Sequence, residues 1–220
     1  VSAAVVDENG QLLGRITVDD VVDVIRDEAD HSVMSMAGLD EDADMFAGVV
    51  PSARRRGLWL GVNLATAFLA AWVVGLFETT IQNIVALAVL MPIVASMGGV
   101  AATQTLTLIV RGLALGQVER TNARWLMTKE FAVALLNGLA WATVVAIVAM
   151  LWFRNWKIAG VIFAAMVVNL VAAALAGVAV PLVLKRFGVD PAMAGGVIVT
   201  TVTDVVGFFV FLGLAALVLL

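Results

Sequence analysis

The feature of this sequence that most constrains its fold is a series of long apolar stretches. A helix needs ~20 apolar residues to cross ~30 Å of hydrocarbon, whereas strands of outer-membrane barrels alternate apolar and polar residues over ~10 positions. Hydrophobic residues make up 62% of the chain and charged residues only 14%, unlike soluble domains. The sequence therefore predicts an all-α polytopic membrane protein with five spans, at about 57–77, 83–110, 131–152, 158–184 and 191–219.

Acidic residues are concentrated ahead of the first span. Twelve of the 17 lie before position 57, and the chain has no cysteine and one histidine, His31. A thiolate or imidazole cluster is therefore excluded, so a bound metal would need oxygen ligands. Negative segments attract cations and repel nucleic acid, which makes divalent cations expected partners and nucleic acid an excluded one.

The N-terminal region reads as a small α/β unit followed by a connecting amphipathic segment. Asn9-Gly10 favours a tight hairpin between strands at 3–7 and 12–17, and Thr17 with Asp20 forms a capping-box pattern that opens a helix. Residues 31–50 predict one or two amphipathic helices before Pro51. Because the chain begins at Val1 without a signal peptide, we expect it to be part of a longer protein.

Basic residues predict the orientation. Arg54, Arg55 and Arg56 precede the first span, which favours a cytoplasmic N-terminus and, with five spans, an external C-terminus. Predicted inner loops carry Arg111, Arg120, Arg124, Lys129, Lys185 and Arg186, and outer loops only Arg154 and Lys157. An odd number of spans without a convincing repeat excludes a simple inverted pair, so a homodimer is expected to supply any symmetry.

Asp204 is the most informative residue. It lies thirteen positions after Pro191 in a mostly apolar helix, which places it on the order of 20 Å along its span. An ionised carboxylate at mid-bilayer costs at least ~2.5 kcal/mol, so the side chain should face a bundle interior or a wet cavity. The alternative is a protonated carboxyl that only ties helices together.

Small and polar residues accompany Asp204. Gly196, Thr200, Thr203 and Gly207 recur at helical spacing near it, and Ser96, Gly99 and Thr103 lie in the second span beyond Pro92. Both sets are expected to line a pore. The competing interpretation is a packing seam, with threonine hydroxyls bonded back to their own helix.

Other carboxylates form two groups. Asp190, before Pro191, suits a helix cap and also a pore mouth that concentrates cations. Asp20, Asp23, Asp27 and Asp30 share one helical face, where a divalent cation would relieve their repulsion; a solvated face is the alternative. Glu78 and Glu130 are interpreted as ordinary interface charges, and Asn169 as an interhelical hydrogen bond. No nucleophile and base pair or phosphate-binding glycine loop is present, so an enzyme is not predicted.

Three segments carry a family resemblance. The opening AVVDENGQLLGRITVDD is similar to the end of a CBS domain, and MPIVASMGGVAATQTLTLIVRGLALG and DPAMAGGVIVTTVTDVVG resemble the second and fifth spans of MgtE-type magnesium channels or transporters. The resemblance implies three regions: the end of a CBS domain at 1–30, a connecting or plug helix at 31–56 and a five-helix pore domain at 57–220.

The resemblance also implies a function. It implies a homodimeric, Mg²⁺-selective pore in the inner membrane, with Asp204 of each chain as pore ligand and Asp190 at the mouth. Cytosolic Mg²⁺, bound at acidic surfaces that include Asp23, Asp27 and Asp30, would close the pore. Val100 stands where the family commonly has Asn, so the resemblance leads us to expect that Mn²⁺, Co²⁺ or Ca²⁺ compete with Mg²⁺. The alternatives are a proton-coupled cation transporter in which Asp204 titrates, and a non-transporting membrane sensor.

Overall fold

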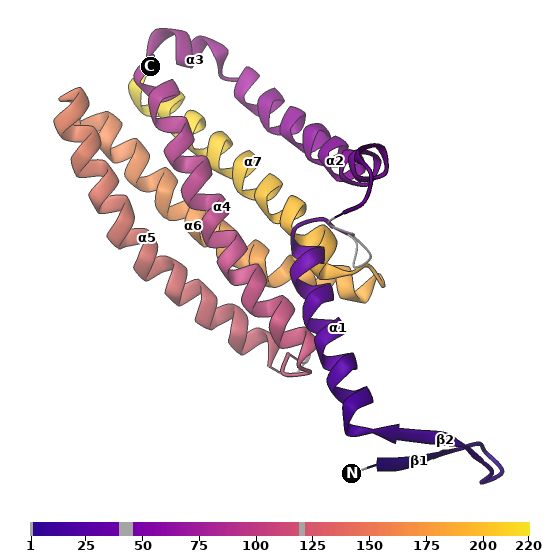
Figure 1. Ribbon diagram of the computed structural model, residues 1–220. Helices are drawn as coiled ribbons and strands as arrows, with labels where there is room; N and C mark the ends of the chain where they lie inside the picture. The colour runs from indigo at the N-terminus through magenta and orange to yellow at the C-terminus, as the bar shows by residue number, and fades with distance from the viewer. Residues whose placement is uncertain (1, 40–45, 119–121) are drawn as a thin grey trace.

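Five long apolar helices dominate the computed structural model, which describes residues 2–39, 46–118 and 122–220 (Figure 1). They are α2 (Val49–Gly75), α4 (Ala86–Ala114), α5 (Ala123–Phe153), α6 (Trp156–Arg186) and α7 (Pro191–Leu219). A short helix, α3 (Glu78–Asn83), joins α2 to α4. The predicted all-α polytopic membrane fold is confirmed. Residues 40–45 of the predicted connecting segment, and Arg120 of a predicted inner loop, lie outside the described residues.

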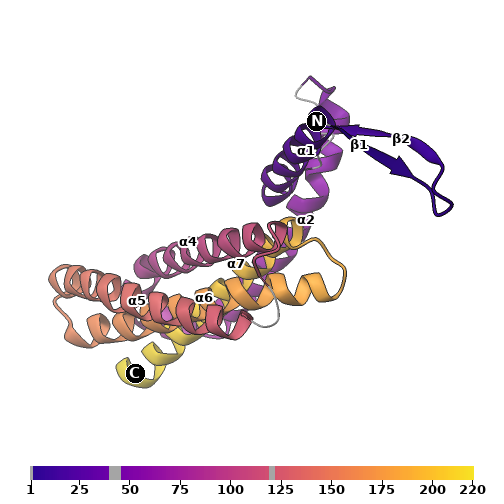
Figure 2. The same cartoon turned by 90° about the horizontal axis from the view of Figure 1, so that it is seen from below.

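The N-terminal region forms a hairpin and a helix, as the sequence predicted. Strand β1 (Ser2–Val6) pairs antiparallel with β2 (Leu12–Thr17), and Gly10 in the turn has a φ of 80°. Helix α1 (Val18–Met36) follows directly. Asp20 accepts hydrogen bonds from the Thr17 backbone nitrogen at 2.7 Å and from the Thr17 hydroxyl at 2.8 Å. The hairpin projects away from the helical bundle at the far end of α1 (Figure 2).

Some helices extend beyond the apolar stretches that revealed them. Helix α2 begins at Val49, ahead of the predicted start at 57, and includes Arg54 to Arg56. Pro51 lies in its first turn, where no intrahelical N–H bond is lost. Helix α5 begins at Ala123 rather than near 131. Hydropathy marks where a helix enters lipid, whereas its backbone hydrogen bonds continue into water through good helix formers such as Arg and Ala.

Helix α6 is the centre of the bundle. It packs against α4, α5 and α7, and its apolar face meets theirs in a core that includes Leu87, Met166 and Phe211, all fully buried. Small residues allow close approach, since a Cβ at Gly177 would lie 2.7 Å from the Cβ of Thr105 on α4. Helix α2 instead packs mainly along α7 and exposes most of its surface within this chain.

Candidate functional site

A cavity of about 620 Å³ lies where α1, α2, α4 and α7 meet. Helix α7 contributes Gly196 and Thr200, and α4 contributes Thr103 and Thr107. A Cβ added at Gly196 would meet no atom within 4 Å, so the cavity reaches the α7 backbone there. Three of the predicted lining residues, Gly196, Thr200 and Thr103, therefore border one space.

Two of the threonine hydroxyls along this space, those of Thr103 and Thr200, donate to their own helices. Thr103 donates to the Gly99 carbonyl at 2.9 Å, and Thr200 donates to the Gly196 carbonyl at 2.9 Å. A hydroxyl has one proton to donate and two lone pairs. Because the proton is used within the helix, each oxygen facing the cavity is an acceptor only. Such a wall suits a ligand that brings hydrogen-bond donors, such as the water shell of a cation.

Asp204 lies one helical turn beyond Thr200. The cavity residues Met193, Val197 and Thr200 are followed by Asp204 at spacings of four, three and four, so all four share one face of α7. Its side chain is partly buried, and no side chain among the described residues gives it a hydrogen bond or ion pair. A carboxylate placed inside a membrane-spanning helix without a protein partner needs a cation, water or a second protein chain.

Two other predicted lining residues point into the protein interior. Thr203 and Gly207 are buried, and a Cβ at Gly207 would lie 2.7 Å from Asn169 Nδ2 on α6. Asn169 is fully buried, and its Nδ2 donates to the Val94 carbonyl on α4 at 2.9 Å. This is the interhelical hydrogen bond that the sequence predicted. Within this chain the seam of Gly207 and Thr203 is therefore a packing contact, and Gly196 with Thr200 forms the open part.

The remaining predicted lining residues lie on α4. Ser96 is exposed, and Gly99 is partly buried and faces α7, where an added Cβ would lie 4.0 Å from the Thr200 methyl carbon. Val100 is 55% exposed and faces a different crevice, between α4 and α5. On α4, Thr103 therefore borders the cavity and Val100 borders the crevice.

Asp190 joins the start of α7 to α1. Its Oδ1 accepts from the Ala192 backbone nitrogen at 2.9 Å, which is the predicted helix cap. Its Oδ2 lies 3.4 Å from His31 Nε2 on α1. This pairing could not be predicted from the sequence, because 158 intervening positions separate the two residues and only the packing of α1 on α7 brings them together.

The C-terminal end of α1 forms one wall of the cavity. Met36 at the end of α1 and Gly38 just after it line the cavity, next to Trp59 of α2. The Thr107 hydroxyl donates to the Met36 sulfur at 3.9 Å. Gly38 has a φ of 69°, and a Cβ there would lie 3.3 Å from the Trp59 ring. This close approach allows the chain leaving α1 to lie under the cavity.

The acidic residues of α1 do not gather into a metal site by themselves. Asp23, Asp27 and Asp30 are exposed, and the described ranges contain no group of three or more His, Cys, Asp or Glu side chains able to hold a metal ion. Their role in cation binding stays a prediction, because it needs ligands from outside this part of the chain.

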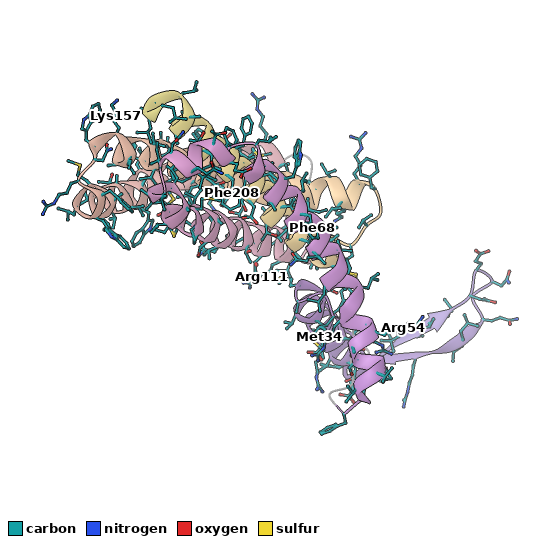
Figure 3. The ribbon with its side chains drawn as sticks, turned by 90° about the horizontal axis from the view of Figure 1, so that it is seen from above. Met34, Arg54, Phe68, Arg111, Lys157 and Phe208 are labelled. Carbon is teal, nitrogen blue, oxygen red and sulfur yellow. The ribbon has the colours of Figure 1, made fainter. Side chains whose placement is uncertain are left out.

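Basic side chains separate toward the two ends of the bundle. Arg111 and Lys157 lie toward opposite ends, and Met34 of α1 and Arg54 of α2 lie beyond Arg111, away from Lys157 (Figure 3). The end that carries α1 therefore also carries Arg111, one of the predicted inner-loop bases.

Comparisons with known proteins identify related sequences. A family model named MgtE and described as a divalent cation transporter matches residues 91–214. The magnesium transporter MgtE of Bacillus subtilis is 31% identical over 211 residues, covering 96% of this chain and 47% of that protein. Its namesake from Thermus thermophilus is 32% identical over 217 residues, covering 98% and 48%. The chain thus spans about half the length of these relatives.

Proposed function

Because this chain belongs to the MgtE family of divalent cation transporters, we propose that it forms a Mg²⁺-selective pore as a homodimer in the inner membrane. The observation that carries the proposal is Asp204, a partly buried carboxylate in a membrane-spanning helix, on the face that continues from the cavity lining. In a dimer the two Asp204 side chains would face each other across the two-fold axis. Magnesium dehydrates reluctantly and is commonly held by one or two carboxylates with its water retained.

The cavity walls suit a hydrated ion. The bound waters of Mg²⁺ present O–H donors, and the acceptor-only oxygens of Thr103 and Thr200 would receive them. Gly196 leaves room for the shell at the backbone. Val100 stands where the family commonly has Asn, and it faces the crevice between α4 and α5 rather than this cavity. Because the chain lacks that amide, Mn²⁺, Co²⁺ or Ca²⁺ are expected to compete with Mg²⁺.

The α1 end provides the gate in this proposal. Met36 and Gly38 border the cavity directly, and His31 meets Asp190 at the first turn of α7. Cytosolic Mg²⁺ bound by Asp23, Asp27 and Asp30, together with ligands beyond this chain's described residues, would hold α1 in place. Movement of α1 away from α7 would then open the cavity toward the cytosol.

The same proposal assigns regions and orientation. Residues 1–30 would be the end of a CBS domain, 31–56 would connect it to the membrane, and 57–220 would form the pore domain. Helix α1 runs without a break across the first of these boundaries. Under the positive-inside rule, Arg54 and Arg111 at the α1 end support a cytoplasmic position for that end, with the C-terminus outside.

The test is divalent-cation flux into liposomes containing this chain, at fixed pH and membrane potential. Asp204→Asn should lose selective Mg²⁺ flux while the protein stays folded and dimeric. Glu78→Gln is the matched control, because it also removes one carboxylate but lies in α3, away from the cavity. Selective flux retained by Asp204→Asn would overturn the role of Asp204. Flux that required a pH gradient would instead identify proton-coupled transport.

A further inference from the structure

Glu130 is a buried carboxylate outside the proposed pore. Its side chain is 7% exposed although it lies on α5, one of the five membrane-spanning helices. Its charge was interpreted from the sequence as ordinary interface charge, and its burial contradicts that interpretation. Thr105 on α4 donates to Glu130 Oε2 at 3.4 Å, and Lys129 Nζ lies 3.2 Å from Oε1.

Two cavities meet at this side chain. One is a crevice of about 330 Å³ between α4, α5 and α6, and the other is a cavity of about 250 Å³ between α4 and α5, which Gln117, Val118 and Asn122 also line. Glu130 lines both. Glu130 therefore stands between the crevice inside the bundle and the cavity that Gln117 and Lys129 also line.

The crevice offers oxygen ligands. Besides Glu130, its walls carry the Thr105 hydroxyl and the carboxamides of Gln104 and Asn137. Carboxylate, carbonyl and hydroxyl oxygens are the ligands that hard divalent cations prefer. A water molecule occupies roughly 30 Å³ in the liquid, so the crevice has room for an ion with a complete first hydration shell.

The two partners of Glu130 differ in exposure. Lys129 is 47% exposed and Glu130 only 7%. The ammonium group can therefore turn into water and leave the carboxylate in place, whereas the carboxylate cannot follow it. This asymmetry makes Lys129 a displaceable counter-ion rather than a permanent buried partner.

We propose that Glu130 is the anchor of a second site for a hydrated divalent cation, off the pore axis in each protomer, and that Lys129 competes with the ion for it. The choice of a divalent cation rests on the proposed function. Thr105 couples the site to the pore, because it lies two residues from Thr103 and packs against Gly177. An ion bound at Glu130 would therefore change the packing of α4, which lines the proposed pore.

The experiment is Mn²⁺ binding to the full chain in detergent, followed by electron paramagnetic resonance. Glu130→Gln should lose one class of bound Mn²⁺ that Asp204→Asn retains. Lys129→Gln should bind that Mn²⁺ on the order of fivefold more tightly, as expected when one positive charge a few ångströms away is removed. The doubly substituted Lys129→Gln, Glu130→Gln chain should lose this gain.

Two results would overturn the proposal. One is Mn²⁺ binding by Glu130→Gln that equals the unsubstituted chain in number of sites and affinity. The other is weaker or unchanged binding in Lys129→Gln, which would mean that the pair is only structural. If Glu130→Gln fails to fold, the direction of the change in Lys129→Gln decides. The flux of Asp204→Asn tests the pore, and Mn²⁺ binding by the Glu130 and Lys129 variants tests the second site. A failure of one proposal can therefore be told apart from a failure of the other.

Discussion

His31 Nε2 on α1 lies 3.4 Å from Asp190 Oδ2 at the first turn of α7. The other oxygen of the same carboxylate accepts from the Ala192 backbone nitrogen at 2.9 Å. One side chain therefore caps the helix that carries Asp204 and also holds the helix that borders the cavity. A displacement of α1 would remove a partner from the residue that begins α7.

Replacing His31 should loosen this junction. His31→Leu keeps a side chain of similar bulk but removes the nitrogen that faces Asp190. A partly exposed ion-pair contact of this kind contributes about 0.2–1 kcal/mol, so the ratio of detached to docked α1 should rise by up to roughly fivefold. Under the proposed gate, Mg²⁺ flux into liposomes should increase, most clearly at the high Mg²⁺ concentrations that favour closure.

The matched control for His31 is Val33→Ala. Val33 lies on the same helix and is 67% exposed, so its truncation should leave flux unchanged. Equal flux in His31→Leu and the unsubstituted chain would show that this contact does not hold α1 in place.

A pair of glycines on α6 tests how closely the helices approach. Gly177→Ala would bring a methyl group 2.7 Å from the Thr105 Cβ and 3.1 Å from the Ala102 carbonyl oxygen. Overpacking of this kind costs about 1–3 kcal/mol. Gly160→Ala, where an added Cβ meets nothing within 4 Å, should be neutral or slightly stabilising. Unfolding in increasing SDS, followed by tryptophan fluorescence, measures both, and equal stability of the two variants would contradict this packing.

Asn169 should show strong coupling to the glycine that faces it. A methyl group at Gly98 would overlap the Asn169 amide, so Gly98→Ala alone should be destabilising. Asn169→Ala removes the hydrogen bond to Val94 but also clears the space. The double variant should therefore be less destabilised than the sum of the single ones, with a coupling of about 0.5–3 kcal/mol. If the destabilisation of the double variant equals the sum of the two single ones, Gly98 and Asn169 do not contact each other as described.

The sequence predicted the spans well because lipid imposes a simple rule. Apolar stretches of sufficient length, with Pro191 at a helix start, identify α4 to α7 without any tertiary information. The hairpin and the Thr17 capping box were also predictable, since both depend on neighbouring residues. Helix ends were less accurate at α2 and α5, because basic residues continue a helix in water beyond the apolar stretch.

The division of the polar residues among cavities could not be predicted. Helical spacing places Gly196, Thr200, Thr203 and Gly207 on one side of α7, but the position of α6 decides which of them are covered. Asn169 covers Gly207, and the space beside Gly196 stays open. Glu130 shows the same limit: its place near a basic interface suggested exposure, whereas α4 buries it through Thr105.

The start of α1 should depend on pH through Asp20. Hydrogen bonds from the Thr17 backbone and hydroxyl favour its ionised form, so its pKa is lowered from the usual value of 3.8. A carboxyl whose folded-state pKa is lowered contributes its full stabilisation above the unfolded pKa, and this is lost as pH falls through the folded value. Amide hydrogen exchange in the first turn of α1 should therefore show less protection below about pH 3.8, after correction for the intrinsic exchange rate. Asp20→Asn should remove this dependence, whereas Asp19→Asn, the neighbouring acid, should keep it; a dependence that survives Asp20→Asn would assign the cap to another group.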